Sequence, residues 1–295
     1  MKTSVDISII ILNYNTRELT LRCLESLSHS SWGKLTKEII VVDNASSDST
    51  VESIRKKFIS VSILQNPQNI GFAAGNNVGI RKAKGRYVLL LNSDTEVEPE
   101  TIRAMVDFMD THPKAGASTC KLVLPDGSMD PACHRGFPTP WNGFSYYAKL
   151  EKVFPKTRFF GGYHMGFMDG NVAHEVDAIS GAFFLVRRET IREVGLLDEA
   201  YFMYAEDIDW SYRIKKAGWE IWFNPAVTVL HIKKKSGREH GDKRQRLKAY
   251  GYFLTNNRLF YTKHYSRKYP PVITFLVYGL YDIQLWISKT FGIVI

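Results

Sequence analysis

The chain has 295 residues, of which 44% are hydrophobic, 23% charged and 13% aromatic, so it is not a disordered, collagen-like or low-complexity protein. Its formal charge of +9 is concentrated at one place, because residues 232–268 contain twelve Lys and Arg against two acidic residues. The rest of the chain is nearly neutral. We therefore expect a boundary near residue 232, between a neutral body and a basic C-terminal region.

The cysteines and the apolar segments indicate where the protein works. Cys23, Cys120 and Cys133 are odd in number and form no CxxC pair, which favours a reducing, cytoplasmic compartment over a disulfide scaffold. No secretory signal or spanning helix is expected, because no apolar run is long enough. The nearest candidate, 272–295, is interrupted by charged and polar residues. It is expected to lie on a membrane surface, to pack on the core, or to form a homodimer contact.

Apolar strand patterns and helix patterns alternate over the first part of the chain. Strands are expected at 7–12, 38–42, 61–64 and 87–91, and helices at 15–28, 49–57, 72–84 and 99–112. Asn15 with Glu18, and Ser49 with Glu52, have the spacing of capping boxes at two of the helix starts. Alternation over about 110 residues predicts an α/β fold with a mostly parallel sheet flanked by helices.

Polar residues directly follow three of the expected strands. They are Asn13-Tyr14-Asn15, Asp43-Asn44 and Asn92-Ser93-Asp94. The carboxyl ends of parallel strands meet at one edge, where ligands of such sheets bind, so these clusters should converge. Asp94 is suited to Mg²⁺ or Mn²⁺ on a substrate diphosphate, or to capping the next helix. Asp43 is suited to accepting an N–H from a pyrimidine base, or to a simple turn.

A glycine-rich stretch at 71–79 has two interpretations. Its small residues could let the backbone approach a phosphate at a helix start. They could equally allow close packing of a helix, because the stretch matches neither phosphate-binding fingerprint, GxGxxG or GxxxxGK[ST].

The second half is less regular, with turn signals and many aromatic residues over 125–175. Strands are expected at 178–186, 221–223 and 226–230, and helices at 189–194 and 207–216. Glu206, Asp207 and Asp209 place three carboxylates at one helix start, where the helix dipole favours anions. Capping would explain one of them, and a carboxylate here could be the general base for an acceptor hydroxyl. His231 ends the last strand, and a lone histidine at such a place is usually structural.

Six segments together carry a family resemblance. They are IIILNYN at 9–15, VVDNASSD at 41–48, NIGFAAGNNVG at 69–79, LLLNSDT at 89–95, SGAFF at 180–184 and YAEDIDWSYR at 204–213. In this order they resemble family 2 inverting glycosyltransferases of the GT-A fold, closest to the bacterial rhamnosyltransferase-like branch. The resemblance covers roughly residues 5–265. It implies a GT-A catalytic domain at 1–232, with a nucleotide-sugar half at 1–124 and an acceptor half at 125–232, followed by a helical extension at 233–295.

The resemblance implies a role for the residues at the strand ends. The residues implied to bind the nucleotide-sugar donor are Asn13, Tyr14, Asn15, Asp43, Asn76, Asn92, Ser93 and Asp94. Among these, Asp43 would hold the pyrimidine and Asn76 would lie near the diphosphate. Asn92-Ser93-Asp94 occupies the position of the family's DxD motif, with Asn in place of the first Asp.

The resemblance also assigns a metal site and a base. Asp94 would bind a divalent metal, Mg²⁺ or Mn²⁺, and His231, with Ser236 after it, would complete the metal site. Asp207 is the second residue of the family's ED motif, which is the general base, and Glu206 and Trp210 of the same segment would contact the acceptor.

The implied activity is metal-dependent, inverting transfer of a sugar in cell-surface polysaccharide synthesis. The donor expected is dTDP-rhamnose, and the acceptor a saccharide or lipid-linked saccharide bound partly by the aromatic stretch 137–168. A transferase of the same fold that uses a UDP-hexose or a UDP-furanose is the alternative. A non-enzymatic protein that binds nucleic acid through its basic region is a distant one, because no nucleic-acid motif is present. The basic and apolar segments 232–268 and 272–295 are expected to dock the enzyme on an anionic cytoplasmic membrane face.

Overall fold

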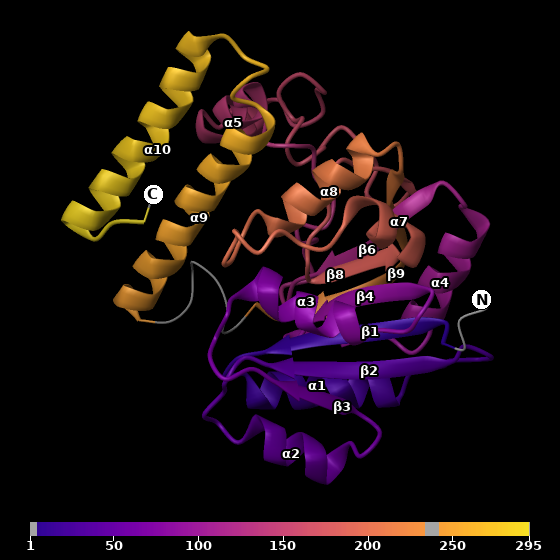
Figure 1. The fold of residues 1–295 in the computed structure, drawn as a ribbon. Coiled ribbons are helices and arrows are strands. Elements are labelled where there is room, and N and C mark those ends of the chain that lie inside the picture. Colours follow the sequence, from indigo (N-terminus) through magenta and orange to yellow (C-terminus); the bar gives the residue numbers. More distant parts are fainter. Residues whose placement is uncertain (1–4, 234–241, 295) are drawn as a thin grey trace.

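The computed structural model describes residues 5–233 and 242–294. It contains a mixed sheet flanked by helices, with a C-terminal helix pair to one side (Figure 1). The strands are β1 (Ile7–Asn13), β2 (Lys37–Asp43), β3 (Ser62–Gln65), β4 (Tyr87–Asn92), β5 (Thr95–Val97), β6 (Ala115–Val123), β7 (His174–Glu175), β8 (Phe183–Arg187) and β9 (Glu220–His231). The helices are α1 (Arg17–Ser28), α2 (Thr50–Lys57), α3 (Phe72–Lys82), α4 (Thr101–Thr111), α5 (Pro140–Tyr147), α6 (Leu150–Val153), α7 (Arg188–Val194), α8 (Glu206–Lys216), α9 (Lys243–His264) and α10 (Pro271–Phe291). The expected α/β class is confirmed.

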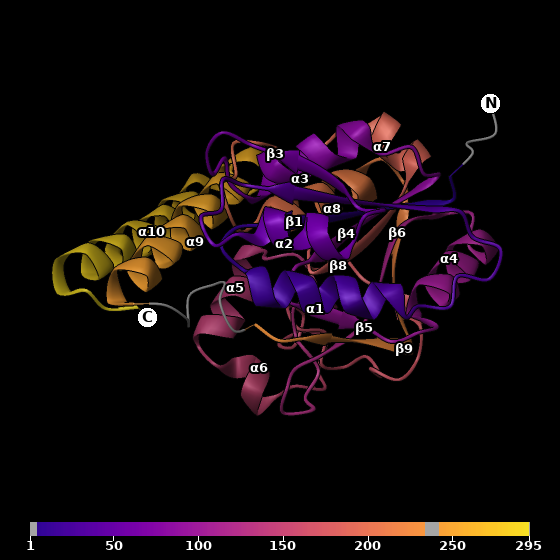
Figure 2. The ribbon, with the colours of Figure 1, turned by 90° about the horizontal axis from the view of Figure 1, so that it is seen from below.

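The first half of the sheet is parallel, as the alternating pattern predicts. The strand order is β3-β2-β1-β4-β8-β6-β9-β5, and β1 pairs in parallel with β2 and β4. The isoleucines of β1 are completely buried, since α3 and α1 cover opposite faces of these strands (Figure 2). In this register Asn13 lies beside Asp43, and Leu12 lies beside Asn92. The polar strand ends therefore converge at one edge.

The second half differs from the sequence expectation in its strands, since β7 was not expected and the strand expected at 178–186 begins only at Phe183, as β8. β6 was not expected, because its segment AGASTCKLV mixes small and polar residues, yet it is buried between β8 and β9. The two short strands expected at 221–223 and 226–230 form the single strand β9. The β6–β9 register shifts where Cys120 pairs with Asn224 but Lys121 pairs with Thr228, and this irregularity accommodates Pro225. β9 also pairs with β5, which places Thr95 beside His231.

Both expected capping boxes are wrong. α1 begins at Arg17, and no side chain caps it. Asn15 instead adopts a left-handed conformation (φ 53°), and its Oδ1 accepts a hydrogen bond from Ser47 N at 2.8 Å. Ser49 is also left-handed and makes no capping bond, while Asp48 Oδ1 accepts the hydrogen bond from Thr50 N. The tertiary contacts of the loops override the local capping pattern.

The glycines of α3 allow it to pack closely on the sheet. A Cβ placed on Gly79 would lie 2.4 Å from Ile10 Cγ2, and one on Gly75 would lie 2.5 Å from Leu12 Cδ1. These distances are too short for carbon atoms, so only glycine fits at this spacing. The geometry supports the packing interpretation of the 71–79 stretch.

Replacing Gly79 with alanine is expected to destabilise the fold by ~1–3 kcal/mol, because the added methyl group overpacks the interface with Ile10. Gly251 in α9 is a matched control, because no atom lies within 4 Å of a Cβ built there. Gly251→Ala should be stabilising by up to about 1 kcal/mol, since alanine favours helix. Urea unfolding of both variants measures the difference. Equal stabilities would contradict the packing role of Gly79.

The C-terminal helices pack on the body and on each other. α9 shares a buried cluster with the segment before residue 232, consisting of Ala178, Tyr201, Ala205 and Ile208 with Phe260, Tyr261 and Tyr265. His264 of α9 hydrogen-bonds Asp209 of α8 at 2.7 Å, and Asn256 donates to Met203 O at 2.8 Å. The helix pair projects on the side of the body opposite α4 (Figures 1 and 2). The boundary near residue 232 is therefore a change in composition, crossed by a shared core.

Candidate active site

The start of α8 holds Glu206 and Asp207 in a strained turn. Tyr204 and Ala205, immediately before them, both have left-handed backbones, with φ values of 72° and 67°. Such conformations are costly for residues other than glycine and cluster at functional sites. The turn is anchored from outside, because Phe72 N at the start of α3 donates a hydrogen bond to Phe202 O at 2.6 Å.

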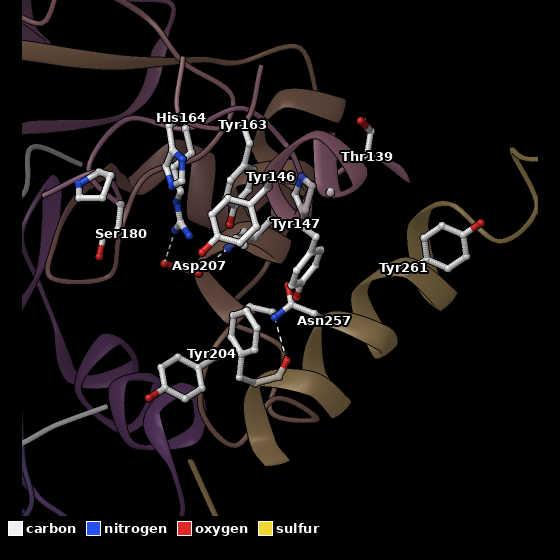
Figure 3. Close-up of a pocket in the computed structure, with 18 of the residues that line it drawn as sticks. Thr139, Tyr146, Tyr147, Tyr163, His164, Ser180, Tyr204, Asp207, Asn257 and Tyr261 are labelled. Atoms are coloured by element: carbon white, nitrogen blue, oxygen red, sulfur yellow. Dashed lines mark hydrogen bonds and ion pairs between the residues drawn. The ribbon is translucent and has the colours of Figure 1, made fainter. Parts of the chain in front are cut away.

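Asp207 forms an ion pair with Arg135, a residue that sequence reasoning missed. Arg135 Nη2 lies 2.7 Å from Asp207 Oδ2, and the two side chains are only 11% and 14% exposed. Ile208 N donates to the other carboxylate oxygen at 2.8 Å. Figure 3 shows Asp207 facing the cavity beside Tyr146 and Tyr163. The carboxylate is thus fixed in orientation at the wall of a cavity.

Glu206 lies next to Asp207 in a different environment. Burial raises the pKa of Glu206 well above its usual value, and the neighbouring charge of Asp207 raises it further. One of its oxygens, Oε2, is buried without a hydrogen-bond partner among the described residues. Two adjacent carboxyl groups in such different environments indicate different roles. Glu206, with its raised pKa, is suited to holding a proton, whereas Asp207 is held in a fixed orientation by its ion pair with Arg135.

Asp94 and His231 meet as the resemblance implies. His231 Nε2 lies 3.5 Å from Asp94 Oδ1, and both side chains are buried. His231 Nδ1 donates to Asp130 Oδ2 at 2.8 Å, and Lys233 Nζ lies 2.9 Å from the other oxygen of Asp130. Burial lowers the pKa of His231, but its hydrogen bonds to Asp130 and Asp94 outweigh this and raise the pKa to about 9. Asp130 was not expected from the sequence, since nothing in its turn-rich segment marks it.

This pair fits a divalent metal held jointly with a substrate. Within 5–233 and 242–294, no group of three or more His, Cys, Asp or Glu is arranged to hold a metal ion. Asp94 and His231 would then supply one oxygen and one nitrogen, and diphosphate oxygens and water the other positions. A bound metal would displace the proton on Nε2, and the bond from Nδ1 to Asp130 would keep Nε2 as the nitrogen that faces the metal. Ser236, expected alongside His231, lies outside the described residues.

The residues expected to bind the nucleotide lie together at the ends of β1 and β2. Asn13 Nδ2 donates to Asp43 Oδ1 at 2.7 Å, and Ser46 N donates to Asp43 Oδ2 at 3.0 Å. Tyr14 is 48% exposed beside them, and Asn15 contacts Ser47. The structure brings these four residues into one region, and their contacts with a nucleotide stay predictions.

Of the remaining residues expected to bind the donor, Asn92 and Ser93 lie near Asp94 and His231, whereas Asn76 does not. Asn92 lines the cavity, and Ser93 Oγ is 3.0 Å from Thr16 Oγ1. Asn76 is buried in α3, where its amide donates to Phe72 O of its own helix at 3.0 Å. Its expected place near the diphosphate stays a prediction.

Trp210 does not lie in the site. It is completely buried, its Nε1 donates to Gly195 O at 2.9 Å, and its ring packs against Phe184 of β8 at 4.9 Å. The prediction that Trp210 contacts the acceptor is wrong, because this side of α8 packs on the sheet. Glu206, in contrast, lines the cavity.

The cavity has a volume of about 1120 Å³ and extends from the metal pair past Asp207 to the C-terminal helices. Residues 138–148 and 163–164 line it, within the aromatic stretch expected to bind the acceptor. α9 and α10 form another wall, which the sequence did not predict.

The fold and the site define a nucleotide-dependent sugar transferase, and comparison with known proteins agrees. The model of the family described as "Glycosyl transferase family 2" matches residues 8–195, and the chain belongs to this family. It is therefore a glycosyltransferase of the GT-A type, as the resemblance implied.

Relatives and solved structures add detail. The chain is 29% identical over 243 residues to the N-acetylglucosaminyl-diphospho-decaprenol L-rhamnosyltransferase of Mycobacterium tuberculosis, covering 78% of each chain. It is 26% identical to the poly-beta-1,6-N-acetyl-D-glucosamine synthase of Staphylococcus epidermidis, covering 74% of this chain but 48% of that enzyme.

Two solved structures share the fold. The mannosyltransferase PcManGT from Pyrobaculum calidifontis, in complex with GDP-Man and Mn²⁺, has a TM-score of 0.60 at 16% identity and covers 99% of this chain and 74% of that one. GalNAc-T7, with UDP, GalNAc and Mn²⁺, has a TM-score of 0.60 at 18% identity, covering 92% and 52%. S. aureus TarS is larger, and the match spans 39% of its chain.

Proposed function

We propose that this chain transfers a sugar from a nucleoside diphosphate sugar to a saccharide hydroxyl, with inversion, in cell-surface glycan synthesis. The observation that supports this best is the shared cavity, which has the oriented carboxylate of Asp207 on one wall and His231, beside Asp94, on another. An acceptor and a donor could therefore meet between a base and a diphosphate-binding metal site.

In this reaction Asp207 takes the proton of the acceptor hydroxyl as its oxygen bonds to the anomeric carbon. The nucleoside diphosphate leaves from the opposite face, so a single displacement inverts the centre through an oxocarbenium-like transition state. Arg135 holds the carboxylate in position, and Glu206, whose pKa is raised by burial, lies beside it. A divalent metal, Mg²⁺ or Mn²⁺, held by Asp94 and His231 would neutralise charge on the departing diphosphate.

The donor proposed is dTDP-rhamnose, and the acceptor a saccharide on a lipid diphosphate. The name of the mycobacterial relative supports both. A UDP-hexose or UDP-furanose is the alternative, because solved structures of the same fold were obtained with UDP or UDP-GlcNAc. A screen of nucleotide sugars, by thermal stabilisation and by donor hydrolysis with Mn²⁺, decides between them. Stabilisation by UDP-sugars without dTDP-rhamnose would favour the alternative, and no response to any nucleotide sugar would contradict the proposal.

Asp130→Asn is expected to weaken Mn²⁺ affinity by about 10–100-fold, the usual effect of losing a partner that orients a metal-binding histidine. Because the asparagine amide can donate to Nδ1, it no longer forces His231 to direct a lone pair at the metal. Calorimetric titration with Mn²⁺ and nucleoside diphosphate measures the affinity. The exposed turn residue Asp126, changed to asparagine, is the control. Equal affinities in the two variants would remove Asp130 from the site.

The structure weighs against the nucleic-acid alternative, which rests on the basic charge of residues 232–268. Stacking on bases requires accessible rings, but Tyr250, Phe260, Tyr261 and Tyr265 of the basic region are buried. Of the basic residues, Lys234, Lys235 and Arg238 lie outside the described residues.

We propose a cytoplasmic location, with α10 and the start of α9 docked on an anionic membrane. By length and composition α10 could also cross a membrane, although no spanning helix was expected from the sequence. It lies along α9, where Arg258 and Asp282 form an ion pair at 3.6 Å and Tyr261 Oη meets Thr274 Oγ1 at 3.0 Å. The exposed bases at the start of α9 are Lys243, Arg244, Arg246 and Lys248. Packing on the core, one of the sequence alternatives, is confirmed in part, because Val277 and Tyr278 pack against the cluster that α9 shares with the body, although only Gln284 and Ser288 of this helix are fully buried.

Liposome flotation tests the docking. The protein is expected to float with anionic vesicles and less with neutral ones, since each well-placed base contributes about 1 kcal/mol. Equal flotation with both would contradict an electrostatic contribution. If the protein binds neither kind of vesicle and sediments as a dimer, α10 would instead form a homodimer contact.

A further inference from the structure

The cavity changes character along its length. At one end Arg135, Asp207, His231 and Lys233 give it polar and charged walls. At the other end two helices face each other with apolar side chains, Trp141 and Phe144 from α5 and Ile273, Leu276, Val277 and Leu280 from α10. A saccharide needs hydrogen-bonding partners, and this second end, which we call the apolar groove, supplies few. It is suited to a ligand with a hydrocarbon part.

α10 has the reverse of the usual amphipathic arrangement. Its buried residues are the polar Gln284 and Ser288, while Phe275, Ile283 and Trp286 are 75%, 57% and 59% exposed. A contiguous exposed apolar stripe of this kind marks a contact with a membrane or a partner. Leu276 and Leu280 belong both to this stripe and to the apolar groove. The groove therefore opens directly onto the surface proposed to meet the membrane.

Tyrosines add hydroxyl groups to the cavity, and Figure 3 shows Tyr146 and Tyr163 beside Asp207. Tyr146, Tyr147, Tyr163 and Tyr281 all line the cavity. Burial raises the pKa of Tyr281, with Tyr147 and Tyr163 adding to the effect, so its hydroxyl stays protonated and can donate a hydrogen bond. Phenol donors in a cavity with an apolar and a polar end match a ligand whose phosphate joins a hydrocarbon chain to a sugar.

We propose that the apolar groove between α5 and α10 binds the first isoprene units of a polyprenyl diphosphate that carries the acceptor saccharide. This rests on the proposed function and deepens it. The chain enters from the bilayer along Leu276 and Leu280, the diphosphate lies among the tyrosines, and the saccharide reaches Asp207. Membrane contact and acceptor binding are then served by the same helix.

Calorimetry with farnesyl diphosphate tests the groove without requiring transfer. Excess UDP and dTDP with Mn²⁺ keep the donor site filled, and inorganic diphosphate is the control for the head group. We expect farnesyl diphosphate to bind at least about tenfold more tightly than diphosphate, because burial of each CH₂ is favourable. Equal affinities would overturn the proposal. Loss of sugar transfer with intact prenyl binding would instead contradict only the proposed function.

Two pairs of variants locate the binding. Gly143 of α5 lines the cavity, with no atom within 4 Å of an added Cβ, so Gly143→Trp should fill the groove. Gly251→Trp, at an equally open position outside the cavity, is its control. Leu276→Glu places a charge in the groove, while Phe275→Glu places one on the exposed neighbour that does not line it.

Gly143→Trp and Leu276→Glu are each expected to weaken farnesyl diphosphate binding at least about tenfold, while both controls stay within about twofold of the wild type. Leu276 is largely exposed, so its variant keeps the test valid if Gly143→Trp fails to fold. Unchanged affinity in Leu276→Glu, or equal losses in Leu276→Glu and Phe275→Glu, would show that the chain does not lie between these helices.

Discussion

Asp207→Asn is expected to abolish transfer, lowering kcat by about 10²–10⁴-fold, the usual contribution of a general base. The amide keeps the size of the side chain and can still accept a hydrogen bond from Arg135, but it cannot take the acceptor proton. Asp207 pairs with Arg135, whereas Asp94 pairs with His231, so donor affinity should change little. Steady-state kinetics and nucleotide calorimetry on the same preparation measure the two effects.

Glu206→Gln is the matched control for this experiment. It makes the same carboxyl-to-amide change on the adjacent residue, whose pKa burial raises well above its usual value. The kcat of Glu206→Gln is expected to stay within about tenfold of the wild-type value. This loss is smaller than the loss expected when a general base is removed. If Asp207→Asn turns over at a near-normal rate, or Glu206→Gln is the more damaged variant, the base is not Asp207.

The parallel half of the fold and its ligand-binding edge could be predicted because their signals are local. A buried parallel strand is mostly apolar, as β1 is with four isoleucines and one leucine, and the chain then turns at polar residues. Alternating strands and helices fix the pairing direction, so the meeting of Asn13 with Asp43 follows from topology alone. The end of β9 at His231 could be predicted in the same way, because an apolar strand pattern is followed there by polar residues.

Arg135 and Asp130 could not be predicted, because their roles depend on contacts distant in sequence. Arg135 meets Asp207 across 72 positions, and Asp130 meets His231 across 101. Both come from an irregular segment where no periodicity shows which side chains point inward. Trp210 was misplaced for a related reason, since a motif shows that residues occur together but not which side of the helix faces the ligand.

The C-terminal helix shows how composition alone can mislead. An apolar 21-residue helix in an otherwise ordinary protein is usually explained by core burial. Here the polar residues Gln284 and Ser288 are buried and Val277 and Tyr278 are partly buried, whereas Phe275, Ile283 and Trp286 remain exposed. The structure is needed to show which side of α10 packs against α9. It also shows that α10 and α5 line the same apolar groove.

Asp94→Ala is expected to remove metal-dependent nucleotide binding. Among the described residues the proposed site has two protein ligands, Asp94 and His231, so losing the carboxylate leaves one neutral nitrogen donor and removes the negative charge that attracts a divalent cation. With Mn²⁺ present, nucleoside diphosphate affinity should fall by more than about 100-fold, beyond the effect of losing an outer partner.

The control for Asp94→Ala separates metal binding from general loss of negative charge. Glu96 lies two residues away and forms an ion pair with Arg22 at the surface, so Glu96→Ala removes the same charge without touching His231. It should keep metal-dependent binding, and in EDTA all three proteins should bind nucleotide equally weakly. If Mn²⁺ strengthens nucleotide binding as much in Asp94→Ala as in the wild type, the metal must be held elsewhere, and the pairing of Asp94 with His231 would then be structural.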